Sequence, residues 1–202
     1  MKVLILINKV GLGDCIIHIN YIHEISKKYR KPVTILAKEN TRAKDLFLDD
    51  PHISEVITLD RLNDNTGCHD GLYGFFKLVK DIKEKKFDKV FIFNSSIRYF
   101  LICKFAGIKK IAQYPLFKKK GQHVVNTAKI FTENELNKIV STQPKLLISE
   151  EKILKARKDI SQSHKNIVLG VSASGPTKRW GIKNFIKLVK KINEKYSSKF
   201  YL

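Results

Sequence analysis

A strand–loop–helix unit occurs twice in this chain of 202 residues, once near each end. The first copy spans residues 3–29 and the second spans residues 167–196. In each copy an apolar stretch is followed by a loop of small residues and then by a helical pattern. An open α/β sheet presents a ligand site in this way, at the carboxyl end of a buried strand. Two copies predict two sheets with a cleft between them.

Apolar stretches and helical patterns alternate along the chain from the first copy up to the second. Strands are expected at 2–8, 32–37, 54–59, 88–94 and 109–113, and helices at 14–29, 40–49, 71–85, 96–106, 122–140 and 149–160. Such alternation predicts a mostly parallel sheet with helices on both faces. The stretches Val3–Ile7 and Val90–Phe93 are apolar at every position, which fits central strands of that sheet.

The pattern divides the chain into two α/β domains. We expect a Rossmann-like domain over residues 1–160 and, after a polar linker at 161–164, the beginning of a second Rossmann-like domain over 161–202. The second domain has a strand at 167–171, a helix at 182–196 and the start of another strand at 199–202. Because a sheet that stops there is incomplete, we expect the chain to be a truncated part of a longer protein.

The composition limits the class of protein. Hydrophobic residues make up 43% of the chain, which is enough for a packed core. No stretch approaches the roughly 20 apolar residues of a membrane-spanning helix, and the first apolar run is interrupted too early for a signal peptide. The three cysteines, Cys15, Cys68 and Cys103, lie too far apart for a zinc site or a disulfide framework. A cytoplasmic location is therefore expected.

The formal net charge of the chain is +20. Two interpretations are open, namely lysine-rich helix faces that are merely solvated, or an anionic partner such as a phosphorylated sugar, a lipid surface or a nucleic acid. Lysine supplies most of the excess charge, and aromatic residues are not interleaved with it as a stacking platform would require. Nucleic acid is therefore the weakest of the three partners.

The first loop carries a carboxylate. Gly11 and Gly13 allow close approach of a ligand to the backbone, but Ile16 stands where a dinucleotide fingerprint needs its third glycine. Asp14 would also repel a pyrophosphate from the helix N-terminus. Two roles are open for Asp14, and they are compatible: a helix N-cap, or a general base that accepts a proton from a bound hydroxyl.

The second loop carries cations. Its hydroxyls, amides and positive charge form a candidate anion site just before a helix: Ser172, Ser174, Gly175, Thr177 and Lys178. The order of a P-loop is absent. The alternative is an ordinary strand-to-helix turn in which Trp180 packs below and Lys178 is solvated.

Other polar segments give weaker signals. No histidine or carboxylate spacing suits a metal, and His18 and His23 are expected to be packed or solvated. His123 opens a helix after the basic residues Lys118, Lys119 and Lys120, either as an exposed polar residue or as a contact to a phosphate or sugar. The polar stretch 63–71 is expected to be a mobile loop or a lid over an acceptor.

Two motifs resemble the family 9 glycosyltransferases, which include the ADP-heptose:lipopolysaccharide heptosyltransferases. They are the opening strand followed by Gly-Leu-Gly-Asp at 11–14, and Ser-Ala-Ser-Gly-Pro-Thr-Lys-Arg-Trp-Gly at 172–181 with Asn184, Phe185 and Leu188 after it. The segment His123-Val124-Val125 is also similar to the family. The resemblance covers nearly the whole chain in the order of its elements.

The resemblance implies a GT-B architecture, in which the N-terminal half binds the acceptor and the C-terminal half binds a nucleotide-sugar donor. It implies metal-independent, inverting transfer of a heptose or related sugar to a phosphorylated lipopolysaccharide core at the inner face of the plasma membrane, with no cofactor. The residues it implies are Asp14 as base, Ser174, Gly175, Thr177 and Lys178 for the donor phosphates, and Gly13, Lys118, Lys119, Lys120 and His123 for the acceptor.

The chain departs from the family's pattern at three points. Gly181 and Asn20 stand where the family usually has proline, and the later donor motif of the family would lie beyond Leu202. We therefore expect this chain alone to be inactive. Two alternatives remain: a Rossmann-type dinucleotide-dependent oxidoreductase, with Glu39 as the one acid able to grip a ribose, and a basic nucleic-acid-binding protein.

Overall fold

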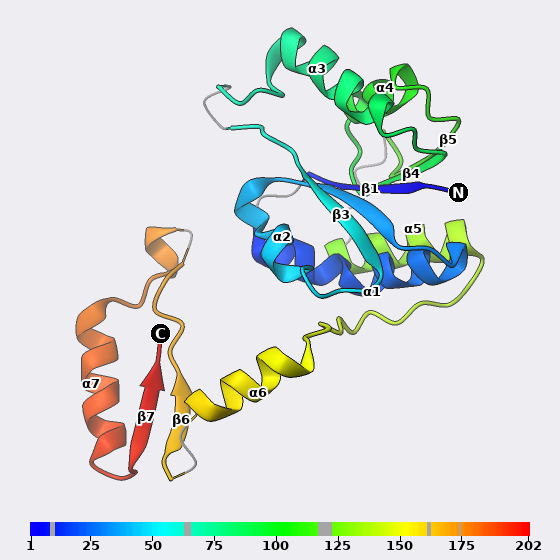
Figure 1. The fold of residues 1–202 in the computed structure, drawn as a ribbon. Helices are drawn as coiled ribbons and strands as arrows, with labels where there is room; N and C mark the ends of the chain where they lie inside the picture. Colours follow the sequence, from blue (N-terminus) through cyan, green and yellow to red (C-terminus); the bar gives the residue numbers. More distant parts are fainter. Residues whose placement is uncertain (9–10, 63–65, 117–122, 161–162, 174) are drawn as a thin grey trace. The chain divides into compact units, whose positions relative to one another are not determined.

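The computed structural model describes all residues except 9–10, 63–65, 117–122, 161–162 and 174, and of Pro176 only the backbone. The described residues form two compact units, Met1–Leu147 and Ile148–Leu202. Each unit is described by itself (Figure 1). The compact units divide after Leu147, and the domain boundary expected near residue 160 stays a prediction.

The first unit is built on a five-stranded parallel sheet in the order β3-β2-β1-β4-β5. The strands are β1 (Val3–Ile7), β2 (Val33–Ala37), β3 (Ile53–Thr58), β4 (Lys89–Ile92) and β5 (Lys110–Gln113). The helices are α1 (Leu12–Tyr29), α2 (Ala43–Leu46), α3 (Gly71–Glu84), α4 (Ile97–Phe105) and α5 (Val124–Leu136), with a 3-10 turn η1 (Glu39–Thr41) before α2. The α/β fold class expected from the sequence is confirmed.

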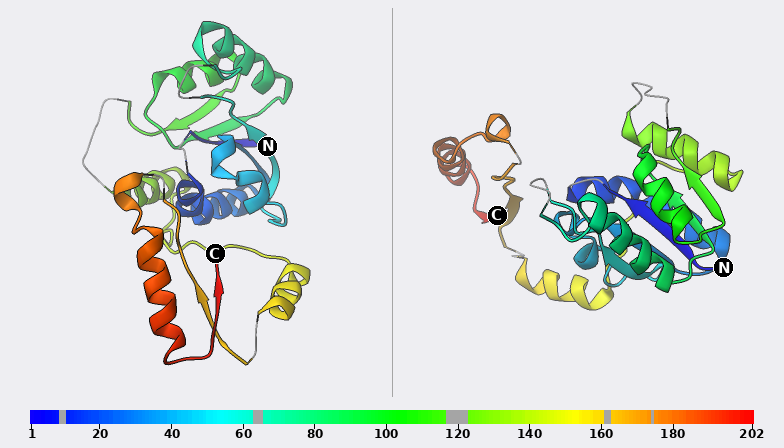
Figure 2. Two further views of the ribbon diagram at one scale, coloured as in Figure 1. Left: turned by 90° about the vertical axis from the view of Figure 1, so that its left-hand side faces the viewer. Right: turned by 90° about the horizontal axis from the view of Figure 1, so that it is seen from above.

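Helices cover both faces of this sheet. Helices α1 and α5 lie on one face and α3 and α4 on the other, which the turned views also show (Figures 1 and 2). Side chains of β1 alternate between the two cores: Ile5 packs with α1 and α5, whereas Leu4 and Leu6 pack with α3 and α4. All five residues of β1 are buried, as expected for a central strand whose two faces are both covered.

The second unit contains a two-stranded parallel sheet of β6 (Lys165–Val168) and β7 (Ser198–Tyr201). Its other elements are α6 (Glu150–Asp159), the 3-10 turn η2 (Pro176–Lys178) and α7 (Ile182–Asn193). Strand β6 begins and ends earlier than the expected 167–171. The residues that pair with β7 run from Lys165, opposite Ser198, to Val168, opposite Tyr201. Among the described residues, no helix is both long enough and apolar enough to cross a membrane.

Candidate active site

Asp14 lies at the carboxyl end of β1, in the first turn of α1. It is the third residue of the helix rather than its N-cap, which is Gly11. The Gly11 N–H donates to Asp14 Oδ2 at 3.1 Å, and the Asp14 N–H donates to the Gly11 carbonyl at 3.1 Å. This reciprocal pair orients a half-buried carboxylate at the positive end of the helix dipole.

Gly13 lies in the same first turn of α1. A Cβ atom built on Gly13 would meet no heavy atom of the described residues within 4 Å, so packing does not require a glycine here. Gly13 is exposed. Within the described ranges, nothing fills the space at Gly13 in the first turn of α1.

Two asparagines that the sequence analysis did not single out meet at the same edge of the sheet. Asn8 directly follows β1, Asn94 follows β4 by two residues, and Asn94 Nδ2 donates to Asn8 Oδ1 at 2.6 Å. The Ser96 N–H donates to Asn94 Oδ1 at 2.6 Å, and Gln113 Nε2 donates to the carbonyls of Asn94 and Ser96, both at 2.9 Å. The sequence signal that could have identified Asn8 and Asn94 is the occurrence of a polar residue just after each apolar strand.

The strand order explains why this edge is a place for a ligand. From β1 the chain moves outward through β2 and β3 and then returns to place β4 on the other side of β1. In open α/β sheets, ligands bind at such a reversal, outside the carboxyl ends of the strands. Asp14, Asn8 and Asn94 all follow β1 or β4 at this point.

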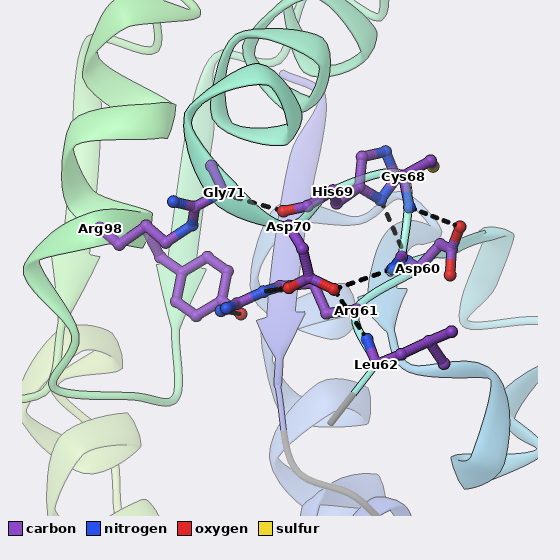
Figure 3. A network of polar contacts seen from close by, with 10 residues as sticks. Asp60, Arg61, Leu62, Cys68, His69, Asp70, Gly71 and Arg98 are labelled. Atoms are coloured by element: carbon purple, nitrogen blue, oxygen red, sulfur yellow. Dashed lines mark hydrogen bonds and ion pairs between the residues drawn. The ribbon is translucent and has the colours of Figure 1, made fainter. Parts of the chain in front are cut away.

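A polar network ties the segment after β3 to helices α3 and α4 (Figure 3). The buried Asp70 carboxylate accepts from Arg61 Nε at 2.8 Å, from the Leu62 N–H at 2.9 Å and from the Gly67 N–H at 3.1 Å. Burial acts to raise the pKa of Asp70, but the Arg61 and N–H hydrogen bonds outweigh it, so that the pKa is lowered. Arg98 Nη2 donates to the carbonyls of His69 and Gly71 at 3.0 and 2.9 Å.

Further contacts hold the same segment close to α3. The Asp60 N–H donates to His69 Nδ1 at 3.0 Å, and the Cys68 N–H donates to Asp60 Oδ2 at 2.9 Å. A Cβ atom on Gly74 would lie 2.2 Å from the His69 carbonyl carbon. The described part of the expected loop, residues 66–71, is thus fixed by contacts to its neighbours, and residues 63–65 lie outside the described residues.

His123 lies at the start of α5, on the same face of the sheet as α1. It is the N-cap residue, and its Nδ1 accepts from the Val125 N–H at 3.4 Å. The Tyr21 hydroxyl donates to the Val125 carbonyl at 3.0 Å and fixes the first turn of α5 against α1. Lys118, Lys119 and Lys120 lie outside the described residues, so their role toward an acceptor stays a prediction.

The two histidines of α1, His18 and His23, are packed. His18 is buried, with its ring edge-on to Phe93 at a centroid distance of 5.0 Å. His23 Nε2 lies 2.6 Å from Asp50 Oδ2, and the His52 N–H donates to Asp50 Oδ1 at 2.9 Å. Burial acts to raise the pKa of Asp50, but these hydrogen bonds lower it below its usual range. Burial lowers the pKa of His52, and the nearby His23 lowers it further.

Metal ligation and ribose binding were the other roles considered for acidic and histidine side chains. Within the described ranges, no group of three or more His, Cys, Asp or Glu side chains is placed to hold a metal ion. Glu39, the acid considered for a ribose, accepts from the Thr58 hydroxyl at 3.0 Å.

The second loop forms a tight turn after β6. The Lys178 N–H donates to the Gly175 carbonyl at 3.1 Å, closing η2, and Arg179 Nε donates to the Ala173 carbonyl at 3.1 Å. The side chains of Thr177 and Lys178 are exposed, and the described residues offer Lys178 neither a hydrogen-bond acceptor for its side chain nor an ion-pair partner. Ser174 lies outside the described residues.

Gly181 explains one departure from the pattern expected of the family. It is the N-cap of α7 and has a φ of 87°. Proline cannot adopt that angle, since its ring fixes φ near −65°. Trp180 is 53% exposed, and its ring lies edge-on to that of Phe185 with the centroids 5.1 Å apart.

The two candidate loops belong to different units, Asp14 to the first and Lys178 to the second. Each unit is described by itself, so the apposition of Asp14 and Lys178 across a cleft stays a prediction. Within its own unit, each loop lies between the carboxyl end of a strand and the start of a helix.

Comparison with protein families gives one match: the model of glycosyltransferase family 9 (heptosyltransferase) matches residues 75–198. Comparison with curated protein sequences gives no match.

Solved structures share the fold. A family 9 glycosyl transferase from Veillonella parvula DSM 2008 is 17% identical with a TM-score of 0.71, over 98% of this chain and 61% of that one. The ADP-heptose LPS heptosyltransferase II of E. coli is 18% identical with a TM-score of 0.68, over 99% and 63%. An E. coli heptosyltransferase solved with ADP is 11% identical with a TM-score of 0.60, over 99% and 67%. This chain therefore spans less than two thirds of the length of the first two structures.

Proposed function

This chain belongs to glycosyltransferase family 9, and we propose that it serves the transfer of a heptose or related sugar from a nucleotide-sugar donor to a phosphorylated lipopolysaccharide core. Membership in a family of transferases favours this function over a dinucleotide-dependent oxidoreductase or a nucleic-acid-binding protein. The proposal includes the peripheral location at the inner face of the plasma membrane, where such an acceptor would be found.

The observation that carries the proposal is the carboxylate of Asp14 at the reversal point of the sheet. The hydrogen bond from the Gly11 N–H holds Oδ2 in place, and no described residue fills the space at Gly13 in the same turn. A carboxylate held so can accept a proton from a sugar hydroxyl that binds at this edge. The Asn8–Asn94 amide pair lies at the same edge and offers groups that suit other hydroxyls of the acceptor.

The proposed reaction is a single displacement with inversion. The acceptor hydroxyl oxygen attacks the anomeric carbon of the donor sugar while its proton passes to Asp14. The bond from that carbon to the diphosphate oxygen breaks, and its electron pair leaves with the nucleoside diphosphate. Lys178, Thr177 and the amides near Gly175, together with Ser174, would stabilise the negative charge that builds on the leaving diphosphate.

Support for the donor side comes from the open turn of the second unit. The exposed ammonium of Lys178 has no ion-pair partner among the described residues, so it is available to pair with an anion. One of the E. coli structures with this fold was solved with ADP. We propose that Lys178 takes a corresponding diphosphate here.

Replacing Asp14 in the complete protein tests the base. Asp14→Asn keeps an oxygen that can accept from the Gly11 N–H but cannot accept a proton at neutral pH. General base catalysis contributes about 10²–10⁴-fold, so we expect a loss of turnover in that range with the donor affinity unchanged. The matched control is Asp45→Asn, which removes an exposed carboxylate paired with Arg42. Turnover of Asp14→Asn near that of the control would refute the role of Asp14.

A further inference from the structure

The outer surface of helices α3 and α4 exposes five large apolar side chains. Their exposed fractions are 79% for Leu72, 82% for Tyr73, 66% for Phe76, 56% for Ile97 and 62% for Phe105. We call this set the α3–α4 apolar patch. Soluble proteins expose single apolar residues commonly, but a large patch of them on one face marks an interaction surface.

Aromatic contacts connect the two helices within the patch. The ring of Phe75 lies 5.3 Å from that of Phe76 and 6.0 Å from that of Phe105, edge-on in both contacts. Phe75 is half-buried and also lies beneath the guanidinium of Arg98, at 5.4 Å. The aromatic residues therefore link α3 to the end of α4.

The apolar side chains of the patch are not needed to attach α3 to the sheet. The inner side of α3 carries the buried residues Gly74, Leu78 and Ile82, of which Leu78 and Ile82 pack with the sheet and α4. Leu72 and Phe76 lie on the opposite side, together with Lys80 and Lys83, because positions four and three apart share a side of a helix. Helix α3 thus has two apolar sides, one of which has no partner among the described residues.

Lysines accompany the patch. Lys80 and Lys83 continue the outer stripe of α3, and Lys104 lies beside Phe105 at the end of α4; all three are exposed. The nearest acid on that stripe is Glu84, whose Oε1 lies 4.0 Å from Lys80 Nζ. Aromatic and aliphatic side chains beside lysines are the composition that binds the interface of an anionic bilayer, where the rings enter the headgroup region and the ammonium groups stay in water.

We propose that the α3–α4 apolar patch docks the protein on an anionic phospholipid surface. Helices α3 and α4 both begin at the carboxyl edge of the sheet, the edge at which Asp14 and the Asn8–Asn94 pair lie. Docking through this patch would therefore bring this edge, where the acceptor is proposed to bind, close to the bilayer. Only the benefit of this placement rests on the proposed function, because docking itself needs neither donor nor acceptor.

Co-sedimentation of the 202-residue chain with lipid vesicles tests the proposal. We expect binding to phosphatidylcholine vesicles that contain about one-third phosphatidylglycerol, weaker binding to pure phosphatidylcholine, and release as salt screens the charges. The double variant Leu72→Ser/Phe76→Ser should bind at least about tenfold more weakly, because each side chain loses its apolar burial. The control Leu48→Ser/Ile139→Ser removes two equally exposed apolar residues of the first unit elsewhere and should bind normally.

A second pair of variants separates the patch from the general positive charge. Lys80→Glu/Lys83→Glu should weaken binding at least about tenfold, since each lysine near an anionic surface contributes about fivefold. Lys28→Glu/Lys31→Glu, at the end of α1 on the other side of the sheet, should change it little. The proposal is overturned by equal losses in both charge variants, by no binding to anionic vesicles, or by sedimentation velocity showing a dimer that Leu72→Ser/Phe76→Ser dissociates.

These results are independent of the transferase proposal. Vesicle binding is measured without donor or acceptor, so an inactive protein that docks through the patch would keep this inference and lose the proposed function. An active transferase that ignores anionic vesicles would do the reverse.

Discussion

Gly74→Ala, in the second turn of α3, should destabilise the first unit although alanine is the better helix former. On helix propensity alone, the change would stabilise a helix by up to about 1 kcal/mol. In the structure, however, the new Cβ atom would lie 2.2 Å from the carbonyl carbon of His69 and 2.6 Å from its Cα. Ordinary carbon contacts are about 3.5–4.0 Å long, so the His69 backbone must retreat by more than about 1 Å.

That retreat disturbs the hydrogen bonds which hold the segment. The Asp60 N–H bond to His69 Nδ1, the Cys68 N–H bond to Asp60 Oδ2 and the Arg98 bond to the His69 carbonyl all lie within two residues of the contact. Each contributes about 0.5–1.5 kcal/mol net, so their weakening costs about 3 kcal/mol in total. After the gain in helix propensity, the free energy of unfolding should fall by about 2 kcal/mol.

Urea and thermal unfolding of the chain, followed by circular dichroism, measure this effect. A loss of about 2 kcal/mol corresponds to a fall in Tm of about 4–8 °C for a domain of this size. Gly13→Ala is the matched control, because its Cβ atom meets nothing within 4 Å among the described residues, and it should leave the Tm unchanged or slightly raised. A Gly74→Ala protein as stable as Gly13→Ala would refute the reasoning, since the helix start would then tolerate the side chain.

Two further predictions concern the half-buried His52 and the second loop. The pKa of His52 is lowered in the folded state, so the unfolded chain binds more protons near pH 6.5. The free energy of unfolding should therefore fall as the pH drops from 7 through that range. His52→Gln should flatten this dependence of the unfolding free energy on pH. The pKa of Asp50 is also lowered, so the stability that Asp50 contributes is present above the ordinary carboxyl pKa of 3.8 and is lost only at lower pH. An unchanged slope in the His52→Gln variant would contradict the assignment of the effect to His52. In the complete protein, Lys178→Ala should weaken binding of the nucleoside diphosphate about 10- to 100-fold, the strength of a charged hydrogen bond. Calorimetry would detect it, with Lys183→Ala in the first turn of α7 as the control, and equal affinities would exclude Lys178 from the anion site.

Much of the fold follows from local sequence patterns. The fully apolar stretch Val3–Ile7 predicts a central strand, and β1 is buried at every position between β2 and β4. The helices of the first unit agree to within a few residues, because their apolar periodicity faces a sheet. The stretch expected as one helix at 40–49 is instead η1 and the short α2, separated at Arg42, which has a φ of 52°. A left-handed residue of this kind is held by its surroundings rather than by its own preference.

The candidate site was predictable in part. Asp14 follows a buried strand and two glycines, so its place at the sheet edge could be expected from the sequence. The Asn8–Asn94 bond joins residues 86 positions apart, and Arg98 reaches the carbonyl of His69 across 29 positions. Such pairs depend on strand order, and a single sequence contains no periodic signal for them. The same limit applies to Gly74, whose importance arises from a neighbouring backbone and not from its own helix.

The strand order also bears on how the chain is made. Strand β1 pairs with β2 soon after both are synthesised, but its other edge pairs with β4, whose residues Lys89–Ile92 follow much later. At about 5–20 residues per second, a ribosome adds the segment between β2 and β4 in about 3–10 s. During that interval a wholly apolar strand has an open edge, which invites pairing with other nascent chains. The first unit should therefore depend on chaperones during translation, and fragments that stop before β4 should aggregate.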